Sequence, residues 1–192
     1  GSYGSERDWE MAAQVYTDAL AEARAGSDTC AEARVLDALG RNASAAGEMQ
    51  KAASYWQLAL DTLRQAPAEH TAFGQPAEAA LLVRLAGAHA TLGNAARAAE
   101  AYRAALPAIR ATGNEREEAL ILRAVADAVS ACGDSAAAAQ FWEQALITAR
   151  ALSARASEVG LLLRLADADL KAGLPTQAAR RYVEAKQVAR ET

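Results

Sequence analysis

Several kinds of residue are scarce in this sequence of 192 residues. It contains two cysteines, two histidines and four prolines, and aromatic residues make up 5% of the chain. No apolar run approaches the roughly 20 residues that a membrane-spanning helix needs. No basic segment followed by an apolar stretch marks a signal peptide at the start. We therefore expect no membrane association, and the opening segment 1–5, GSYGS, is interpreted as an expression-tag remnant.

A basic surface is also missing. The net charge of −4 argues against nucleic acid as a partner, because its phosphates require an excess of lysine and arginine. Cys30 and Cys132 are isolated in alanine-rich segments and lack metal-ligand spacing, which predicts buried reduced thiols. A reducing cytoplasm is the expected location.

Catalytic patterns are absent as well. His70 and His89 have no metal-ligand spacing, and the chain has no phosphate-binding glycine loop, nucleophile elbow or Cys–His arrangement. Carboxylates are numerous, but on helices they mostly mark solvated faces. We expect no enzyme, no cofactor and no metal.

What the sequence does contain is an internal repeat. An aromatic residue with alanine four positions before it and three positions after it occurs five times, at steps of 40, 46, 40 and 40 residues. A glycine stands nine residues before each of the last four aromatics, and a Leu-x-x-apolar-Gly/Ala motif precedes each glycine. The aromatic residues are Tyr16, Trp56, Tyr102, Trp142 and Tyr182, the glycines are Gly47, Gly93, Gly133 and Gly173, and the motifs begin at Leu36, Leu82, Leu122 and Leu162.

These spacings describe pairs of helices. Apolar residues at i, i+3 and i+4 share one helix face, and glycine suits the left-handed position that ends a helix. Each unit is thus a first helix (helix A), a glycine turn and a second helix (helix B). Small residues let the two backbones approach closely, and one pair cannot bury both apolar faces, so neighbouring pairs must stack.

The order of these motifs resembles the tetratricopeptide repeat (TPR) over residues 8–191. The resemblance implies an all-α fold, a right-handed α-solenoid of antiparallel helix pairs with about nine helices. Two departures are a period of 40 rather than 34 residues and an arginine where the family's proline closes helix B. Such lengthened repeats are similar to those of bacterial signalling ATPases and actinomycete regulators. We expect each arginine to complement the helix dipole and to reach a carboxylate of the next repeat; they are Arg24, Arg64, Arg110, Arg150 and Arg190.

The predicted organisation is a single TPR array over 6–192. Helix B1 covers 8–25, and the repeats cover about 29–65, 76–111, 115–152 and 155–191. The insertion 66–78 is either a tolerated surface segment or a loop whose His70 and Phe73 contact a ligand. Pro107 should bend its helix or end it early. The array begins and ends on a helix B, so its uncapped ends indicate a fragment or self-association.

The resemblance also implies a binding surface, because TPR arrays bind partners in a concave groove lined by helices A. Matching the family's groove positions through the glycines gives a mixed-charge set. It consists of Arg34, Asp37, Arg41, Arg123, Asp127, Ser130, Asp167 and Lys171. The carboxylate clamp of chaperone-tail-binding TPR domains is missing, since its positions hold Asp37, Arg41, Leu120 and Ala124 in one register.

The expected function is a non-catalytic protein- or peptide-binding scaffold, an interaction or regulatory module of a larger bacterial protein. The alternative is a small-molecule- or peptide-sensing domain, in which the insertion closes over a pocket in the groove.

Overall fold

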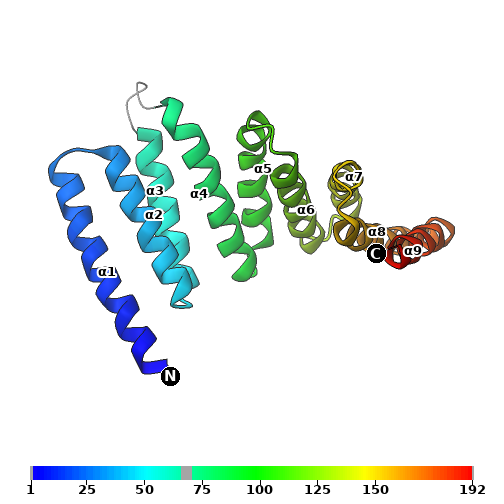
Figure 1. Cartoon of the computed structure of the whole chain (residues 1–192), viewed down its shortest axis with the longest axis horizontal. Coiled ribbons are helices and arrows are strands. Elements are labelled where there is room, and N and C mark those ends of the chain that lie inside the picture. Colours follow the sequence, from blue (N-terminus) through cyan, green and yellow to red (C-terminus); the bar gives the residue numbers. More distant parts are fainter. Residues whose placement is uncertain (1, 66–70, 192) are drawn as a thin grey trace. The chain divides into compact units, whose positions relative to one another are not determined.

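The chain is a succession of helices joined by tight turns (Figure 1). The computed structural model describes the backbone of residues 2–65 and 71–191, and the side chains of 8–65 and 77–191. Within these ranges there are nine helices and no strand. The helices are α1 (Ser2–Ala25), α2 (Thr29–Ala45), α3 (Met49–Gln65), α4 (Thr71–Thr91), α5 (Ala95–Ala111), α6 (Glu115–Ala131), α7 (Ser135–Ala151), α8 (Arg155–Lys171) and α9 (Pro175–Arg190).

Most predicted helix bounds agree with the structure to within one residue; α1 and α4 differ. Helix α1 begins at Ser2 rather than near residue 8, so it includes most of the segment interpreted as a tag remnant. Helix α4 begins at Thr71 rather than near residue 76, so the second half of the insertion is helical. Residues 66–70 lie outside the described part of the chain.

The turn within each helix pair is made by glycine, as predicted. Gly47, Gly93, Gly133 and Gly173 have φ of +81°, +76°, +91° and +75°, a region that residues with a Cβ rarely adopt. Ser27 and Ser153 end helices B in the same conformation, with φ of +53°.

The chain divides into two compact units, Gly1–Ala105 and Leu106–Thr192. In unit 1, α2 and α3 pack as a pair; in unit 2, α6 packs with α7 and α8 with α9. Alanine at the predicted close contacts is fully buried, as at Ala52, Ala59, Ala138 and Ala145. Pro107 does not end α5 early, because the helix runs on to Ala111.

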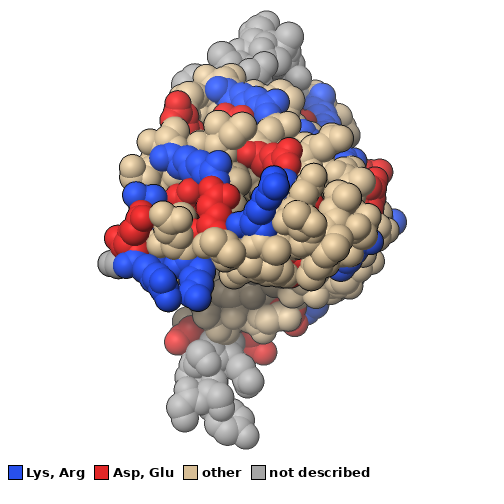
Figure 2. Space-filling view, turned by 90° about the vertical axis from the view of Figure 1, so that its right-hand side faces the viewer, with Lys and Arg blue, Asp and Glu red and all other residues tan. Residues whose placement is uncertain are grey.

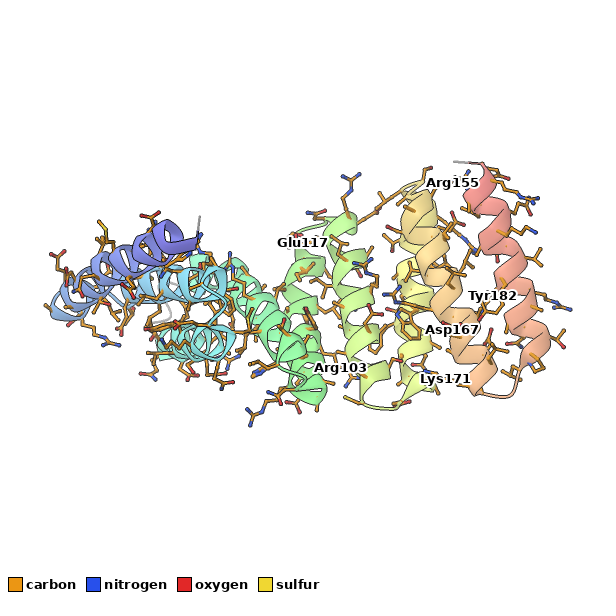
Figure 3. The ribbon with its side chains drawn as sticks, turned by 90° about the horizontal axis from the view of Figure 1, so that it is seen from below. Arg103, Glu117, Arg155, Asp167, Lys171 and Tyr182 are labelled. Carbon is orange, nitrogen blue, oxygen red and sulfur yellow. The ribbon has the colours of Figure 1, made fainter. Side chains whose placement is uncertain are left out.

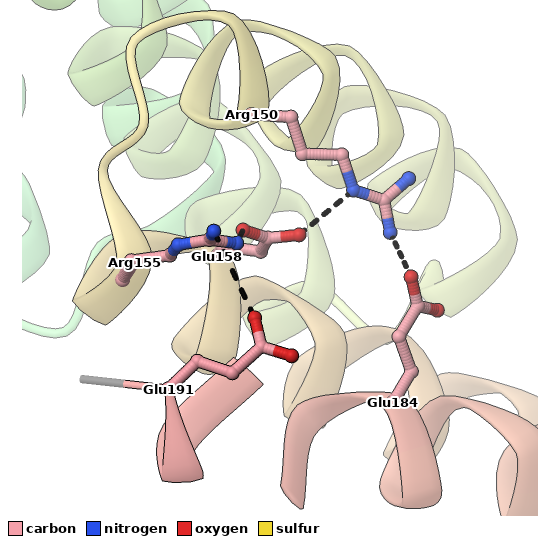
Figure 4. A network of polar contacts seen from close by, with 5 residues as sticks. All are labelled: Arg150, Arg155, Glu158, Glu184 and Glu191. Atoms are coloured by element: carbon pink, nitrogen blue, oxygen red, sulfur yellow. Dashed lines mark hydrogen bonds and ion pairs between the residues drawn. The ribbon is translucent and has the colours of Figure 1, made fainter. Parts of the chain in front are cut away.

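The terminal arginine of helix B reaches the next helix A, as the sequence predicts. Four such pairs join an arginine Nε to a glutamate Oε1: Arg24–Glu32 at 2.7 Å, Arg64–Glu78 at 2.9 Å, Arg110–Glu118 at 2.7 Å and Arg150–Glu158 at 3.0 Å. In unit 2 the Arg150–Glu158 pair is part of a network (Figure 4). Arg150 also contacts Glu184, and Glu158 also contacts Arg155, which lies 3.8 Å from Glu191. The recurrence of one geometry shows that the arginine links successive helix pairs within each unit.

The cysteines are less buried than predicted. Both are free thiols, Cys30 is half-buried, and Cys132 is exposed at the C-cap of α6. The prediction of a buried thiol is therefore wrong for Cys132, because α6 ends at Ala131 and Cys132 lies in the turn before Gly133. In the described ranges no helix is long and apolar enough to cross a membrane.

Candidate functional site

In unit 2, helices A bring four predicted groove residues together. Asp127 and Ser130 of α6 and Asp167 and Lys171 of α8 line one hollow of about 230 Å³. The spacing i, i+3 on α6 and i, i+4 on α8 places each pair on one face of its helix. The remaining lining comes from Ser135, Trp142, Arg164 and Ala168.

Asp127 is the central group of this hollow. Its Oδ1 accepts a hydrogen bond from the indole Nε1 of Trp142 on α7, at 2.9 Å. The guanidinium of Arg164 on α8 donates from Nε to Oδ1 at 2.8 Å and from Nη2 to Oδ2 at 3.3 Å. One carboxylate therefore joins three helices, and its paired bonds to Arg164 fix its orientation.

Asp167 is also held by a neighbour. The hydroxyl of Tyr182 on α9 donates to its Oδ1 at 2.5 Å, and the two side chains point toward each other in Figure 3. This hydrogen bond, with a smaller contribution from burial, raises the pKa of Tyr182 above its ordinary value. The phenol therefore stays protonated and keeps its role as a donor.

Two cations on this surface remain available. Lys171 and Arg123 are exposed, and neither has a hydrogen bond or ion pair with any residue in the described ranges. Leu120 and Leu163 are 49% and 42% exposed on the same two helices. A ligand would meet two carboxylates already bonded, two free cations and two apolar side chains.

Unit 1 places Arg34, Asp37 and Arg41 on α2. Arg34 and Asp37 line a hollow of about 140 Å³ together with residues of α3 and α4. Asp37 accepts from Trp56 Nε1 at 3.1 Å and from Arg84 Nη1 at 3.0 Å, and Arg41 Nε lies 3.4 Å from its other oxygen. Arg41 is thus engaged with Asp37 within its own helix.

Three further predicted site residues are not among those that line the two hollows. Arg123 does not line the hollow of unit 2. His70 lies outside the described residues, and Phe73 belongs to α4 but its side chain is not described. Whether a partner contacts any of the predicted groove residues stays a prediction. Among the described side chains, no three of His, Cys, Asp or Glu are close enough to hold a metal ion.

Sequence reasoning missed the partners that hold the aspartates. Arg84 and Arg164 each stand nine residues before a turn glycine, and both reach back to the aspartate of the preceding helix pair. The sequence did contain a signal. Trp56 and Trp142 each have an indole N–H to donate, and the repeat that follows each tryptophan is one that contains the arginine.

No protein-family model matches the chain, and no curated protein matches its sequence. Many solved structures do match. BtubC (BKLC) from P. vanneervenii is 22% identical with a TM-score of 0.76, over 97% of this chain and 75% of that one. A signal-transduction ATPase with a tetratricopeptide repeat sensor from Pyrococcus horikoshii is 18% identical with a TM-score of 0.72, over 93% and 28%. A Rap conjugation gene regulator of plasmid pLS20, in complex with the Phr* peptide, is 14% identical with a TM-score of 0.59, over 86% and 44%.

These likenesses concern the fold. Together with the helices and glycine turns, they confirm the predicted fold class, an all-α solenoid of the TPR type.

Proposed function

We propose that the chain is a non-catalytic scaffold that binds a protein or peptide partner through its helix A faces. The hollow of unit 2 carries the proposal, because its carboxylates are held by Trp142, Arg164 and Tyr182 while Lys171 and the nearby Arg123 keep their charges free. Preorganised groups lose little entropy on binding. A surface with these properties favours an extended acidic segment that also carries an apolar side chain for Leu120 and Leu163.

A peptide is favoured over a small molecule on two grounds. The hollow of about 230 Å³ is smaller than the roughly 300–1,000 Å³ that is usual for small-molecule sites. A TPR sensor and a regulator bound to a peptide are among the similar structures. The small-molecule alternative is therefore not favoured for the hollow of unit 2.

The test uses blocked peptides of equal length that differ in charge. We expect a Glu- and Leu-containing peptide to bind more tightly than its Lys and Leu counterpart, in fluorescence polarisation at two salt concentrations. The double variant R123A/K171A should weaken the acidic peptide by about tenfold or more, since each lost contact with a charged group is worth about 1.5–3 kcal/mol. The matched control R180A/K186A removes two exposed cations from α9 of the same unit and should leave binding unchanged. Equal loss in both variants would reduce the effect to net charge and sink the proposal.

The cellular setting is part of the same proposal. We place the module in the cytoplasm, as part of a larger bacterial regulatory protein, and the two free thiols support a reducing compartment. A nucleic-acid partner is not proposed: the face shown in Figure 2 intersperses acidic and basic side chains, and the net charge is −4. Self-association through the end helices remains a prediction that sedimentation velocity would check.

A further inference from the structure

Unit 1 contains a larger hollow between two of its helices B. It has a volume of about 830 Å³ and lies between α3 and α5, with α4 as its floor. We refer to it as the α3–α5 cleft. Its polar and charged lining residues include Gln57, Asp61 and Arg64 of α3, His89 of α4, and Arg97 and Glu100 of α5.

The cleft exists because α5 has two small residues where the helices B of unit 2 have large ones. By the repeat register, Ala101 corresponds to Phe141 and Arg181, and Ala104 corresponds to Gln144 and Glu184. Ala101 and Ala104 both line the cleft. Because positions i and i+3 are neighbours on one helix face, the two small side chains leave one continuous space.

The corresponding positions of unit 2 are bridged by side chains. Arg181 of α9 lies 3.0 Å from Glu143 of α7 and 3.0 Å from Asp169 of α8. In unit 1, Gln57, Ala101 and His89 stand at these three positions, and the methyl group of Ala101 is too short to bridge to the other two. The Nδ1 of His89 is buried without a hydrogen-bond partner in the described part of the chain.

The arginine at the end of α3 lacks the second partner that its two equivalents in unit 2 have. Arg110 donates from Nη2 to Gln144 Oε1 at 3.3 Å, and Arg150 donates from Nη2 to Glu184. Arg64 keeps its contact from Nε to Glu78 at 2.9 Å, but Ala104 stands where that second acceptor would be. Arg97 also lines the cleft and has no hydrogen bond or ion pair with a described residue.

We infer that the α3–α5 cleft docks a helical segment of a partner protein with a bulky side chain followed, three residues later, by a carboxylate. The bulky side chain fills the space over Ala101 beside His89, and the carboxylate accepts from Arg64, with Arg97 adding positive charge nearby. The chain itself shows this combination at Arg181 and Glu184 of α9, and at Phe141 and Gln144 of α7 with an amide for the carboxylate. The cleft lies on the helix B side, so this is a second surface, separate from the proposed groove.

The electrostatic state of His89 agrees with an apolar neighbour. Its pKa is lowered below the ordinary value, first by burial and then by the charge of Arg97. The imidazole is therefore neutral at pH 7 and adds no charge that a bulky apolar side chain would have to desolvate.

The experiment uses the whole chain and three blocked, helix-forming peptides that contain Phe-x-x-Glu, Phe-x-x-Lys or Ala-x-x-Glu in one background. Nuclear magnetic resonance follows the Arg64 side-chain Nε, His89 and Ala101. We expect saturable shifts with the Phe-x-x-Glu peptide at concentrations up to about 1 mM, and about tenfold weaker binding of the other two. No saturable shift with any peptide, or equal shifts with all three, overturns the inference.

Variants then assign the binding to the cleft. A101F/A104Q copies α7 and should abolish the shifts, whereas R123A/K171A in the groove should leave them unchanged. Circular dichroism checks that each variant keeps its helices. If A101F/A104Q does not fold, R64Q serves instead and should weaken the two peptides that carry Glu, by about tenfold, while leaving the Phe-x-x-Lys peptide unchanged. Binding that survives the folded cleft variant overturns the inference, and because the groove variant is scored separately, the two proposals fail independently.

Discussion

The two units contain the same junction of tryptophan, aspartate and arginine, but the aspartate stands at different places. In unit 1, Asp37 bonds to Trp56 and Arg84; in unit 2, Asp127 bonds to Trp142 and Arg164. Asp37 lies ten residues before its turn glycine and Asp127 lies six before its own, which is about one helical turn apart. The tryptophans and arginines occupy equivalent positions in the two units.

Asp37 corresponds to Arg123 and Arg41 to Asp127, so the aspartate and an arginine are exchanged between the units, and a glycine accompanies the exchange in unit 1. A Cβ at Gly40 would lie 2.4 Å from Trp56 Nε1 and 2.7 Å from its Cδ1, so this indole position requires glycine. Unit 2 has Ala126 at the equivalent position, and its indole N–H turns to the carboxylate on the other side, Asp127. In both units one carboxylate lies between an indole and a guanidinium, although the aspartate that supplies it stands at a different position of the repeat.

The largest expected effect comes from removing either indole. W56A and W142A each delete a ring that is about 95% buried, with 4% and 5% exposed, and each should cost about 3–5 kcal/mol. Hydrogen exchange should show the loss of protection in α2–α4 for W56A and in α6–α8 for W142A. Loss spread evenly over both units by either variant would show that they do not unfold separately.

Exchanging the small residues tests how closely Trp56 packs against Gly40. G40A should destabilise unit 1 by about 1–3 kcal/mol, because the overlap with Trp56 outweighs the roughly 1 kcal/mol that alanine gains over glycine in a helix. A126G should cost about 1 kcal/mol through helix propensity, without an overlap. Urea denaturation of both variants measures this, and a stabilised G40A would contradict the account of the indole position.

The arginine–glutamate pairs give a smaller contrast. Glu158 of unit 2 has a side chain 6% exposed and contacts both Arg150 and Arg155, whereas Glu78 of unit 1 is 35% exposed and contacts Arg64. E158A should cost about 1–3 kcal/mol because it removes a buried carboxylate that two arginines contact, and E78A at most about 1 kcal/mol. Double-mutant cycles with R150A and R64A measure the two couplings; equal couplings would show that burial does not decide their strength.

The smallest expected effect is a pH dependence confined to unit 1. The pKa of His89 is lower in the folded chain than in the unfolded one, so the unfolded state binds more protons as the pH falls. The stability of unit 1 should be full above about pH 6.5 and decline below it. H89Q should remove this slope in urea titrations. A slope that persists in H89Q assigns the dependence to another group.

The sequence predicts the helices well because their signals are local and repeated. Five aromatic residues, four of them nine residues after a glycine, define the helix pairs, and the glycine conformations follow from sterics alone. The insertion was harder to place, because proline and glycine before Ala77 indicate a loop while the structure continues α4 back to Thr71.

The candidate site was predicted only in part. Matching TPR positions predicts which residues face a groove, and unit 2 does bring Asp127, Ser130, Asp167 and Lys171 together in one hollow. It does not indicate which charges are already paired, because Arg164 and Asp127 are 37 residues apart and Arg84 and Asp37 are 47 apart. Ala101 and Ala104 do not stand out in an alanine-rich sequence. Their importance appears only when they are compared with the larger residues at the same positions of α7 and α9.

The position of Asp127 also links recognition to mechanics. Its two oxygens are the point at which α6, α7 and α8 are tied together, and they face the hollow where a ligand would sit. A ligand that leaves these bonds in place adds a fourth support and raises the melting temperature of unit 2. A ligand whose own cation displaced Arg164 would remove this side-chain bond between α6 and α8, so the charge of the ligand would decide whether binding strengthens or weakens the unit.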